Sequence, residues 1–166
     1  MPATGKIREW PADRDDLVDA VLGASRALVA VAARSLADLA EDVTLAQYRA
    51  LVELAARGAQ RPADLASALG VDRSTATRMC DRLVRKRLVQ RRRISADRRG
   101  VRISLSPAGR ALVEEVTRRR RVEIAQVLGR MPRADRASAL RALRVFADAA
   151  GEVPEQDWSL GWGPEE

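Results

Sequence analysis

Apolar residues recur at helical spacing over long stretches at both ends of the chain. Residues 17–40 follow a 3.6-residue period behind a cluster of aspartates, which predicts a long first helix over about 13–42. Similar periodicity predicts a helix over about 107–130, with Ser106 as its N-cap, and a last helix over about 133–150. These long helices flank a middle region of shorter elements.

In that middle region, capping residues mark the ends of two short helices. Thr44 and Gln47 have the spacing of a capping box, so a second helix is expected to begin there and to stop at Gly58. A third helix is expected over 63–69, because a proline precedes it and a glycine closes it. A fourth helix follows at once, so the order helix, glycine-containing turn, helix predicts a helix-turn-helix.

The fourth helix, expected from its N-cap Asp72 to about Lys86, has one apolar and one polar side. The apolar side carries Ala76, Cys80, Leu83 and Val84; the polar side carries Ser74, Arg78, Asp81 and Arg85, with Thr75, Thr77 and Arg82 on the flanks. The first side is expected to pack. The second is either a solvated surface or a surface that contacts a ligand.

Two stretches with strand character follow, over 88–94 and 101–105, and the second alternates apolar and polar residues. The sequence SADRRG between them is rich in turn formers. We therefore expect a two-stranded wing, which must lean on neighbouring helices because an isolated hairpin is marginal in water.

Charge distinguishes this middle region from the rest of the chain. Between Asp72 and Arg102 there are 12 basic and 3 acidic residues, whereas the remaining residues hold 18 basic and 20 acidic ones. A basic patch confined to one segment is typical of proteins that bind a phosphate backbone. A non-specific DNA binder would instead spread its charge along the chain.

Composition narrows the remaining function classes. Apolar residues make up 46% of the chain and aromatic residues only 3%, which favours packed helices over a β-sandwich or barrel. Histidine is absent and Cys80 is the single cysteine, so imidazole sites, thiolate clusters and intrachain disulfides are excluded, and no metal site or cofactor is expected. The sequence shows no nucleophile with a partner base, so nothing in it supports an enzyme. Neither a secretory signal nor an apolar run of membrane-spanning length is found, so we expect a cytoplasmic protein without a membrane partner.

About 70 residues in this order resemble the MarR family of transcriptional regulators. The resemblance is carried by TLAQYRAL from Thr44, DLASALGV from Asp64, DRSTATRMCDRLVRKRLVQR from Asp72, and DRRGVRISLSPAGRAL over 97–112. Its most specific part is the Asp-Arg-Arg wing followed by Ser-Pro-Ala-Gly. One departure is Arg87, where family members often have glycine. At this helix end Arg87 is expected either to strain the turn slightly or to extend the helix.

The resemblance implies a mainly α, winged helix-turn-helix protein of about six helices, whose helices from both termini interlock in a homodimer. The implied domains are an N-terminal arm and first dimerisation helix over 1–43, the DNA-binding domain over 44–106, the C-terminal dimerisation helices over 107–150 and a flexible tail over 151–166. Trp158 and Trp162 of this tail could instead dock on the protein. The implied function is a ligand-responsive repressor that binds double-stranded DNA at a pseudo-palindromic operator. A winged helix that binds proteins instead would not need arginines at the wing tip.

The expected DNA-contacting residues fall into three sets. Ser74, Thr75, Thr77 and Arg78 are expected in the major groove, with Arg82 on the flank of the same helix. Arg73 and Arg91 are expected at phosphates, and Asp97, Arg98 and Arg99 at the wing tip. Arg78 could read guanine O6 and N7 with two hydrogen bonds. Arginines at a wing tip suit a narrow minor groove, although Asp97 and Arg99 could also pair merely to stiffen the turn.

The signal that the protein senses is open at this stage. By the family resemblance, a small anionic or phenolic effector could bind, and four consecutive arginines, Arg118 to Arg121, could contribute to its pocket. They could equally pair with nearby glutamates. Redox sensing would require Cys80 to be exposed and activated, and the neighbouring Arg78 and Arg82 could lower its pKa. Its place on the apolar side instead favours a packing role.

Overall fold

The structure is a computed structural model that describes residues 14–40, 42–93 and 101–158. Within these residues six α-helices, two strands and one 3-10 helix follow one another. They are α1 (Arg14–Ala37), α2 (Leu45–Arg57), α3 (Pro62–Leu69), α4 (Arg73–Arg85), β1 (Val89–Arg93), β2 (Val101–Leu105), α5 (Pro107–Gly129), α6 (Arg133–Ala149) and η1 (Glu155–Asp157). The expected fold class is confirmed.

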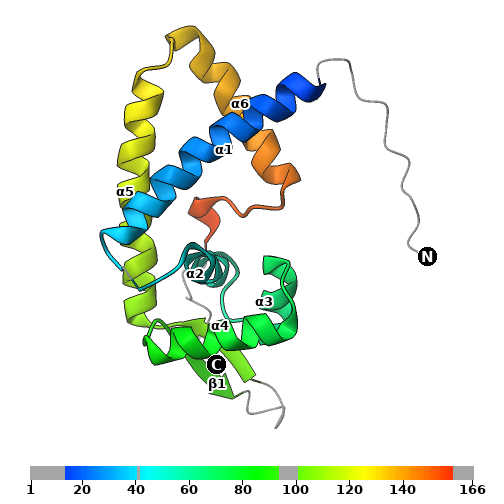
Figure 1. The fold of residues 1–166 in the computed structure, drawn as a ribbon, viewed down its shortest axis with the longest axis vertical. Helices are drawn as coiled ribbons and strands as arrows, with labels where there is room; N and C mark the ends of the chain where they lie inside the picture. Colours follow the sequence, from blue (N-terminus) through cyan, green and yellow to red (C-terminus); the bar gives the residue numbers. More distant parts are fainter. Residues whose placement is uncertain (1–13, 41, 94–100, 159–166) are drawn as a thin grey trace, which may run out of the picture.

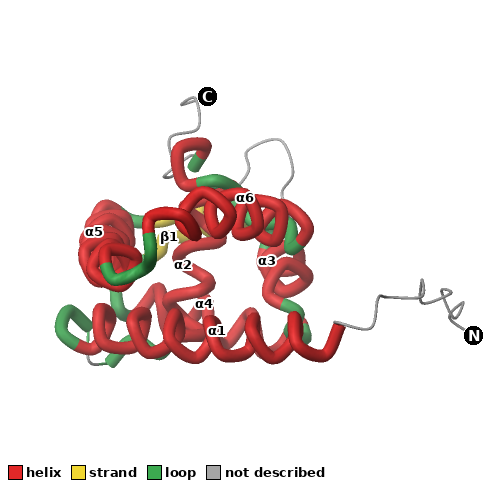
Figure 2. Tube along the Cα trace, turned by 90° about the horizontal axis from the view of Figure 1, so that it is seen from above, coloured by secondary structure: helices red, strands yellow, loops and turns green. Residues whose placement is uncertain are grey.

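The elements form two parts joined by α5 (Figure 1). A lower lobe contains α2, α3, α4 and the two strands, and an upper arm contains α1, α6 and most of α5. Viewed from above, α1 and α6 run on opposite sides of the molecule, with α5 seen almost end-on between their ends (Figure 2). Helix α5 is therefore the element that the lobe and the arm share.

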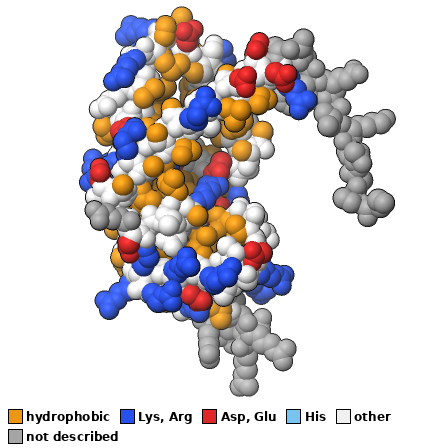
Figure 3. All heavy atoms as spheres, viewed as in Figure 1, with side chains coloured by type: hydrophobic (Ala, Val, Ile, Leu, Met, Phe, Trp, Pro, Cys, Tyr) orange, Lys and Arg blue, Asp and Glu red, His pale blue; other side chains and the backbone are white. Residues whose placement is uncertain are grey.

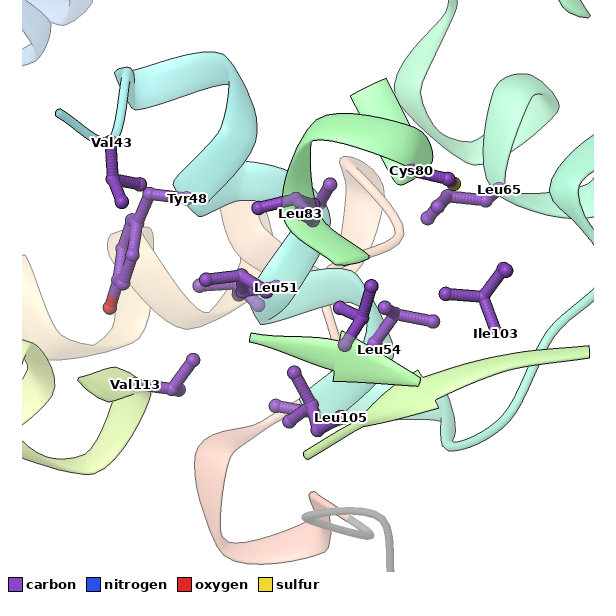
Figure 4. Close-up of a cluster of buried hydrophobic side chains, with 14 of the residues drawn as sticks. Val43, Tyr48, Leu51, Leu54, Leu65, Cys80, Leu83, Ile103, Leu105 and Val113 are labelled. Carbon is purple, nitrogen blue, oxygen red and sulfur yellow. The ribbon is translucent and has the colours of Figure 1, made fainter. Parts of the chain in front are cut away.

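The hydrophobic core lies in the lobe (Figure 4). Leu51 and Leu54 of α2 occupy its centre and are fully buried. Around them pack Leu65 of α3, Leu83 of α4, Ile103 and Leu105 of β2, and Val113 of α5. Because every element of the lobe contributes to this one cluster, the core fixes the position of α4.

Most of the expected helix ends are confirmed, and the end of α1 is not. Thr44 accepts a hydrogen bond from Gln47 N at 3.2 Å, and the Gln47 side chain accepts one from Thr44 N at 3.4 Å, which completes the capping box. In contrast, α1 ends at Ala37 rather than near residue 42. Both Leu36 and Val43 enter the core, and the chain must turn between them to bring α2 beneath α1.

The wing is an antiparallel ladder in which Val89 pairs with Leu105 and Arg93 with Val101. It has a third partner that the periodicity did not predict. Gln60 N donates to Ile103 O at 3.0 Å, and Ile103 N donates to Gln60 O at 2.7 Å. This bridge attaches β2 to the segment between α2 and α3, so the hairpin leans on the lobe as expected. The turn over 95–100 lies outside the described residues.

The joint between α4, β1 and α5 is tightly constrained. Arg87 follows α4 with a φ of 58°, the left-handed conformation that glycine favours at a helix end. Leu88 N donates to Leu83 O at 3.0 Å and Arg87 N to Val84 O at 2.9 Å, which completes a Schellman motif. A Cβ atom at Gly109 would lie 1.9 Å from Leu88 O, so only glycine allows α5 to approach this turn.

Part of the segment expected to be a flexible tail, residues 151–158, is packed against the body of the protein. Trp158 is half-buried, contacts the hydrophobic core and donates through Nε1 to Val153 O at 2.9 Å. For Trp158 the structure agrees with the docked alternative, because an indole can bury its ring while its N–H remains hydrogen-bonded. Residues 159–166 of the expected tail lie outside the description.

Candidate nucleic-acid interface

Helix α4 lies at the lower edge of the molecule with its polar side toward solvent (Figures 1 and 3). Ala76, Cys80 and Leu83 are fully buried on its other side. Lys and Arg side chains gather over this edge in the space-filling view (Figure 3). The two sides of the helix are therefore divided as the sequence predicts.

The start of α4 is organised by the carboxylate of Asp72. It accepts hydrogen bonds from Thr75 N at 2.8 Å, from Ser74 Oγ at 2.6 Å and from Thr75 Oγ1 at 2.7 Å. The hydrogen bond from the Ser74 hydroxyl is the largest cause that holds the pKa of Asp72 well below its ordinary value. Asp72 thus caps the helix as expected and also orients two side chains of the expected DNA-contacting set.

Arg78 lies over the same turn. Its Nη2 atom is 3.2 Å from Thr75 Oγ1 and 3.5 Å from Ser74 Oγ. The guanidinium is exposed and stands beside two hydroxyls that keep free lone pairs. The structure therefore brings Ser74, Thr75 and Arg78 together as one polar group on the solvent side of α4.

Other expected contacts on α4 are placed around this group. Arg73 and Arg82 are exposed at its first and third turns. Thr77 is exposed, but its hydroxyl donates to Arg73 O at 2.8 Å, so its methyl group and a remaining lone pair are what it offers a ligand. Arg85 is also exposed in the last turn, which the polar pattern placed on this side although it was not among the expected contacts.

The expected phosphate contact Arg91 forms an ion pair with Asp81, which links β1 to α4. The periodicity placed Asp81 on the ligand-facing side of α4 and gave no sign of this pair, because it joins two elements through their tertiary packing. Both side chains are only partly exposed. Arg91 is consequently held beside α4 and keeps its remaining guanidinium donors for another partner. Asp97, Arg98 and Arg99 lie outside the described residues.

Cys80 is fully buried between α4 and the core. Burial raises the pKa of its thiol, and the positive charge of Arg91 acts in the opposite direction. A buried thiol with a raised pKa is typical of a packing residue rather than of a reactive one. The cation that lowers the pKa of this thiol is Arg91 of the wing. The sequence had suggested Arg78 and Arg82 for this effect.

The four consecutive arginines of α5, Arg118 to Arg121, are distributed around the helix. Arg118 binds Glu115 with two hydrogen bonds of 2.7 Å, Arg119 bridges Glu115 at 3.0 Å and Asp38 at 3.2 Å, and Arg121 binds Glu155 at 2.9 Å. Arg118 and Arg121 also line a cavity of about 240 Å³ together with Val113, Glu114, Thr117, Glu155 and Trp158. Arg118 and Arg121 thus both pair with glutamates and line this cavity.

Within the described ranges, no group of three or more Cys, Asp or Glu side chains is arranged to hold a metal ion. None of the helices described is long and apolar enough to cross a membrane.

Comparisons with known proteins agree with this geometry. A model of the MarR family matches residues 43–101. The multiple antibiotic resistance protein MarR of Salmonella typhimurium is 33% identical over 102 residues, which are 61% of this chain and 71% of that protein. The transcriptional repressor MdtR of Bacillus subtilis is 30% identical over 123 residues, 74% of this chain and 79% of its own length.

A solved structure is also similar over almost its whole length. The crystal structure of RV1404 from Mycobacterium tuberculosis superposes with a TM-score of 0.81 at 41% sequence identity, covering 87% of this chain and 99% of RV1404. This coverage extends well beyond the residues 43–101 that the family model matches. This chain belongs to the MarR family of transcriptional regulators.

Proposed function

We propose that the protein is a cytoplasmic repressor that binds a pseudo-palindromic DNA operator as a homodimer. The observation that carries the proposal is α4, whose buried side is fixed by the core while its solvent side presents Ser74, Thr75 and Arg78 as one polar group. A helix of this width fits the major groove of B-DNA. The surrounding exposed arginines supply the phosphate contacts that give affinity.

The homodimer is supported by apolar side chains that the single chain leaves exposed. They lie on the three helices of the arm: Leu17, Val18, Leu22, Leu28 and Val29 of α1, Val122, Val127 and Leu128 of α5, and Leu140, Leu143, Val145 and Phe146 of α6. Figure 3 shows hydrophobic side chains over this part of the molecule. Exposed apolar surface on this scale favours association with another subunit.

Within this proposal the expected contacts have separate roles. Arg78 reads a guanine, with Ser74, Thr75 and Thr77 beside it in the major groove, while Arg73, Arg82 and Arg91 contact phosphates. Asp97, Arg98 and Arg99 form the wing tip that reaches an adjacent minor groove. Two copies of α4 related by a two-fold axis require half-sites about one helical turn apart, roughly 10 base pairs.

The roles of Arg78 and Arg82 can be separated by their effects on binding. Arg78→Ala should lower affinity for the preferred site by about 1–3 kcal/mol and relax the sequence preference at one base pair. Arg82→Ala should weaken binding to all sequences and reduce the salt slope by about one. Fluorescence anisotropy against a site selected from random duplexes, over a salt titration, measures both effects.

The matched control is Arg133→Ala, which removes an exposed arginine at the start of α6. The start of α6 is far from α4 (Figure 1). It should bind DNA as the unchanged protein does. If Arg78→Ala and Arg133→Ala have the same affinity and the same base preference, α4 is not the element that reads DNA.

We further propose that a small anionic or phenolic effector regulates this binding. The cavity beside α5 offers Arg118 and Arg121 to an anion, and the ring of Trp158 to an aromatic group. Aromatic carboxylic acids and phenols should therefore reduce operator affinity, and Arg121→Gln should reduce their effect. A panel of such compounds that leaves binding of the unchanged protein unaltered would refute the effector.

A further inference from the structure

The segment after α6 runs back across the lobe. Residues 151–158, which we call the C-terminal strap, begin with a turn at Gly151, whose φ is 73°, and end at Trp158 after the 3-10 helix η1. In Figure 1 the strap descends from the end of α6 and lies directly above α2. It therefore spans the space between the arm and the lobe.

The first half of the strap is held by α2. The guanidinium of Arg49 forms a two-pronged ion pair with Glu152, with N···O distances of 2.5 and 3.1 Å. About two turns further along α2, Arg57 Nη2 donates to Gly151 O at 2.9 Å. Arg57 is itself oriented by the buried carboxylate of Glu53 at 2.5 Å.

The second half is held by α5. Glu155 binds Arg121 at 2.9 Å, and Trp158 packs against the core beside Val113. Exposed ion pairs of this kind stabilise little individually, because water competes for them and salt screens them. The half-buried indole of Trp158 is therefore the main anchor, and the ion pairs set its direction.

The strap closes a ring of contacts between the arm and the lobe. No residue of α6 is buried, so the packing of α6 within the chain does not fix its position. The strap joins the end of α6 to α2 and then to α5, and α5 leads back to the start of α6. A ring that includes both parts restricts rotation of the lobe about α5.

We propose that the C-terminal strap fixes the orientation of the DNA-binding lobe relative to the arm, and thereby the distance between the two α4 helices of the dimer. The proposal rests on the proposed function. A site with two half-sites needs one distance, and a protein that already holds it loses less conformational entropy when it binds. A single half-site makes no such demand.

The first experiment needs no DNA. Spin labels are placed on Arg85→Cys in α4 and Ala137→Cys in α6, in a Cys80→Ala background, and labelled chains are diluted with unlabelled ones so that only the pair within one chain is measured. Trp158→Ala should widen the distance distribution by about twofold, because the lobe then samples more orientations. An unchanged width would overturn the proposal.

A second variant and a control address misfolding. Glu152→Gln removes the contact with Arg49 and leaves Trp158 in place, so it should widen the distribution to a smaller degree. Asp157→Asn makes the same kind of change in the same segment, at a carboxylate that takes part in none of the ion pairs found among the described residues. It should leave the distribution unchanged, and widening equal to that of Glu152→Gln would overturn the proposal.

The second experiment compares a full site with a single half-site, both taken from selection on random duplexes. Trp158→Ala should lose about tenfold in affinity for the full site and keep its affinity for the half-site. Equal losses on both, or none on the full site, would overturn the proposal. If selection with the unchanged protein recovers no site, the proposed function fails, and the spin-label distances alone decide whether the strap restrains the lobe.

Discussion

Arg87 ends α4 in a conformation that side chains other than glycine rarely adopt. Its φ of 58° allows the Schellman hydrogen bonds, and its carbonyl accepts Ser106 Oγ at 2.6 Å, so the start of α5 depends on this turn. The sequence departs from the family pattern here, and the structure shows that the helix end keeps the glycine-like conformation. The strain in the turn was expected, and the alternative of a longer α4 is wrong.

Replacing Arg87 with glycine should therefore stabilise the protein. Relief of the left-handed conformation is worth about 1 kcal/mol, and the greater freedom of the unfolded chain opposes it by about half as much. The free energy of unfolding should rise by about 0.5 kcal/mol, as measured by urea denaturation. Arg82→Gly, in the interior of α4, should lower it by about 1 kcal/mol. Equal losses in the two variants would contradict the left-handed conformation of Arg87.

Among the helices, capping residues in the sequence predicted those helix ends that hydrogen bonds within a few residues determine. The capping box at Thr44, the glycine at the end of α3 and the N-cap Asp72 each satisfy backbone groups within a few residues, and each is found as expected. The end of α1 and the Gln60 bridge depend on residues far along the chain. Neither could be derived from periodicity, because the residues that end α1 and those that pair with Gln60 are brought together only by the tertiary fold.

The candidate site divides in the same way. The solvent side of α4 follows from helical spacing, so Ser74, Arg78 and Arg82 were predicted to be exposed and are. The pairing of Arg91 with Asp81 and the anchoring of the strap by Arg49 and Arg121 join different elements. A single sequence marks such residues as charged without showing which of them meet.

The ion pairs of Glu115 in α5 should make the stability of the protein depend on pH. Hydrogen bonds from Arg118 and then Arg119 lower the pKa of Glu115 to about 2, whereas an unfolded glutamate titrates near about 4.3. The stability that Glu115 contributes is thus complete above about pH 4.3 and is lost as the pH falls toward about 2. Glu115→Gln should lower the melting temperature at pH 7 and have little effect near pH 2.

The control for that comparison is Glu114→Gln, which neutralises the neighbouring exposed glutamate. Its melting temperature should differ little from that of the unchanged protein at either pH. A difference for Glu115→Gln that stays constant from pH 7 to pH 2 would show that its ion pairs do not stabilise the fold.

In the whole molecule, the arm exposes apolar side chains that the proposed second subunit would cover. Phe146 is 55% exposed on the side of α6 that also carries Leu143. We expect Phe146→Glu to halve the mass measured by sedimentation, because a buried charge without a partner destabilises an interface. Arg141→Glu, on the side of the same helix away from Leu143 and Phe146, should leave the mass unchanged. Identical masses for the two variants would place the subunit contact elsewhere.

We expect two copies of α4, related by the two-fold axis of the proposed dimer, to bind one symmetric site. Hydroxyl-radical footprinting on a site selected from random duplexes tests this expectation. Two protected regions related by a two-fold axis should appear, with centres roughly 10 base pairs apart. Protection that extends evenly along the duplex, or that covers a single half-site, would contradict it.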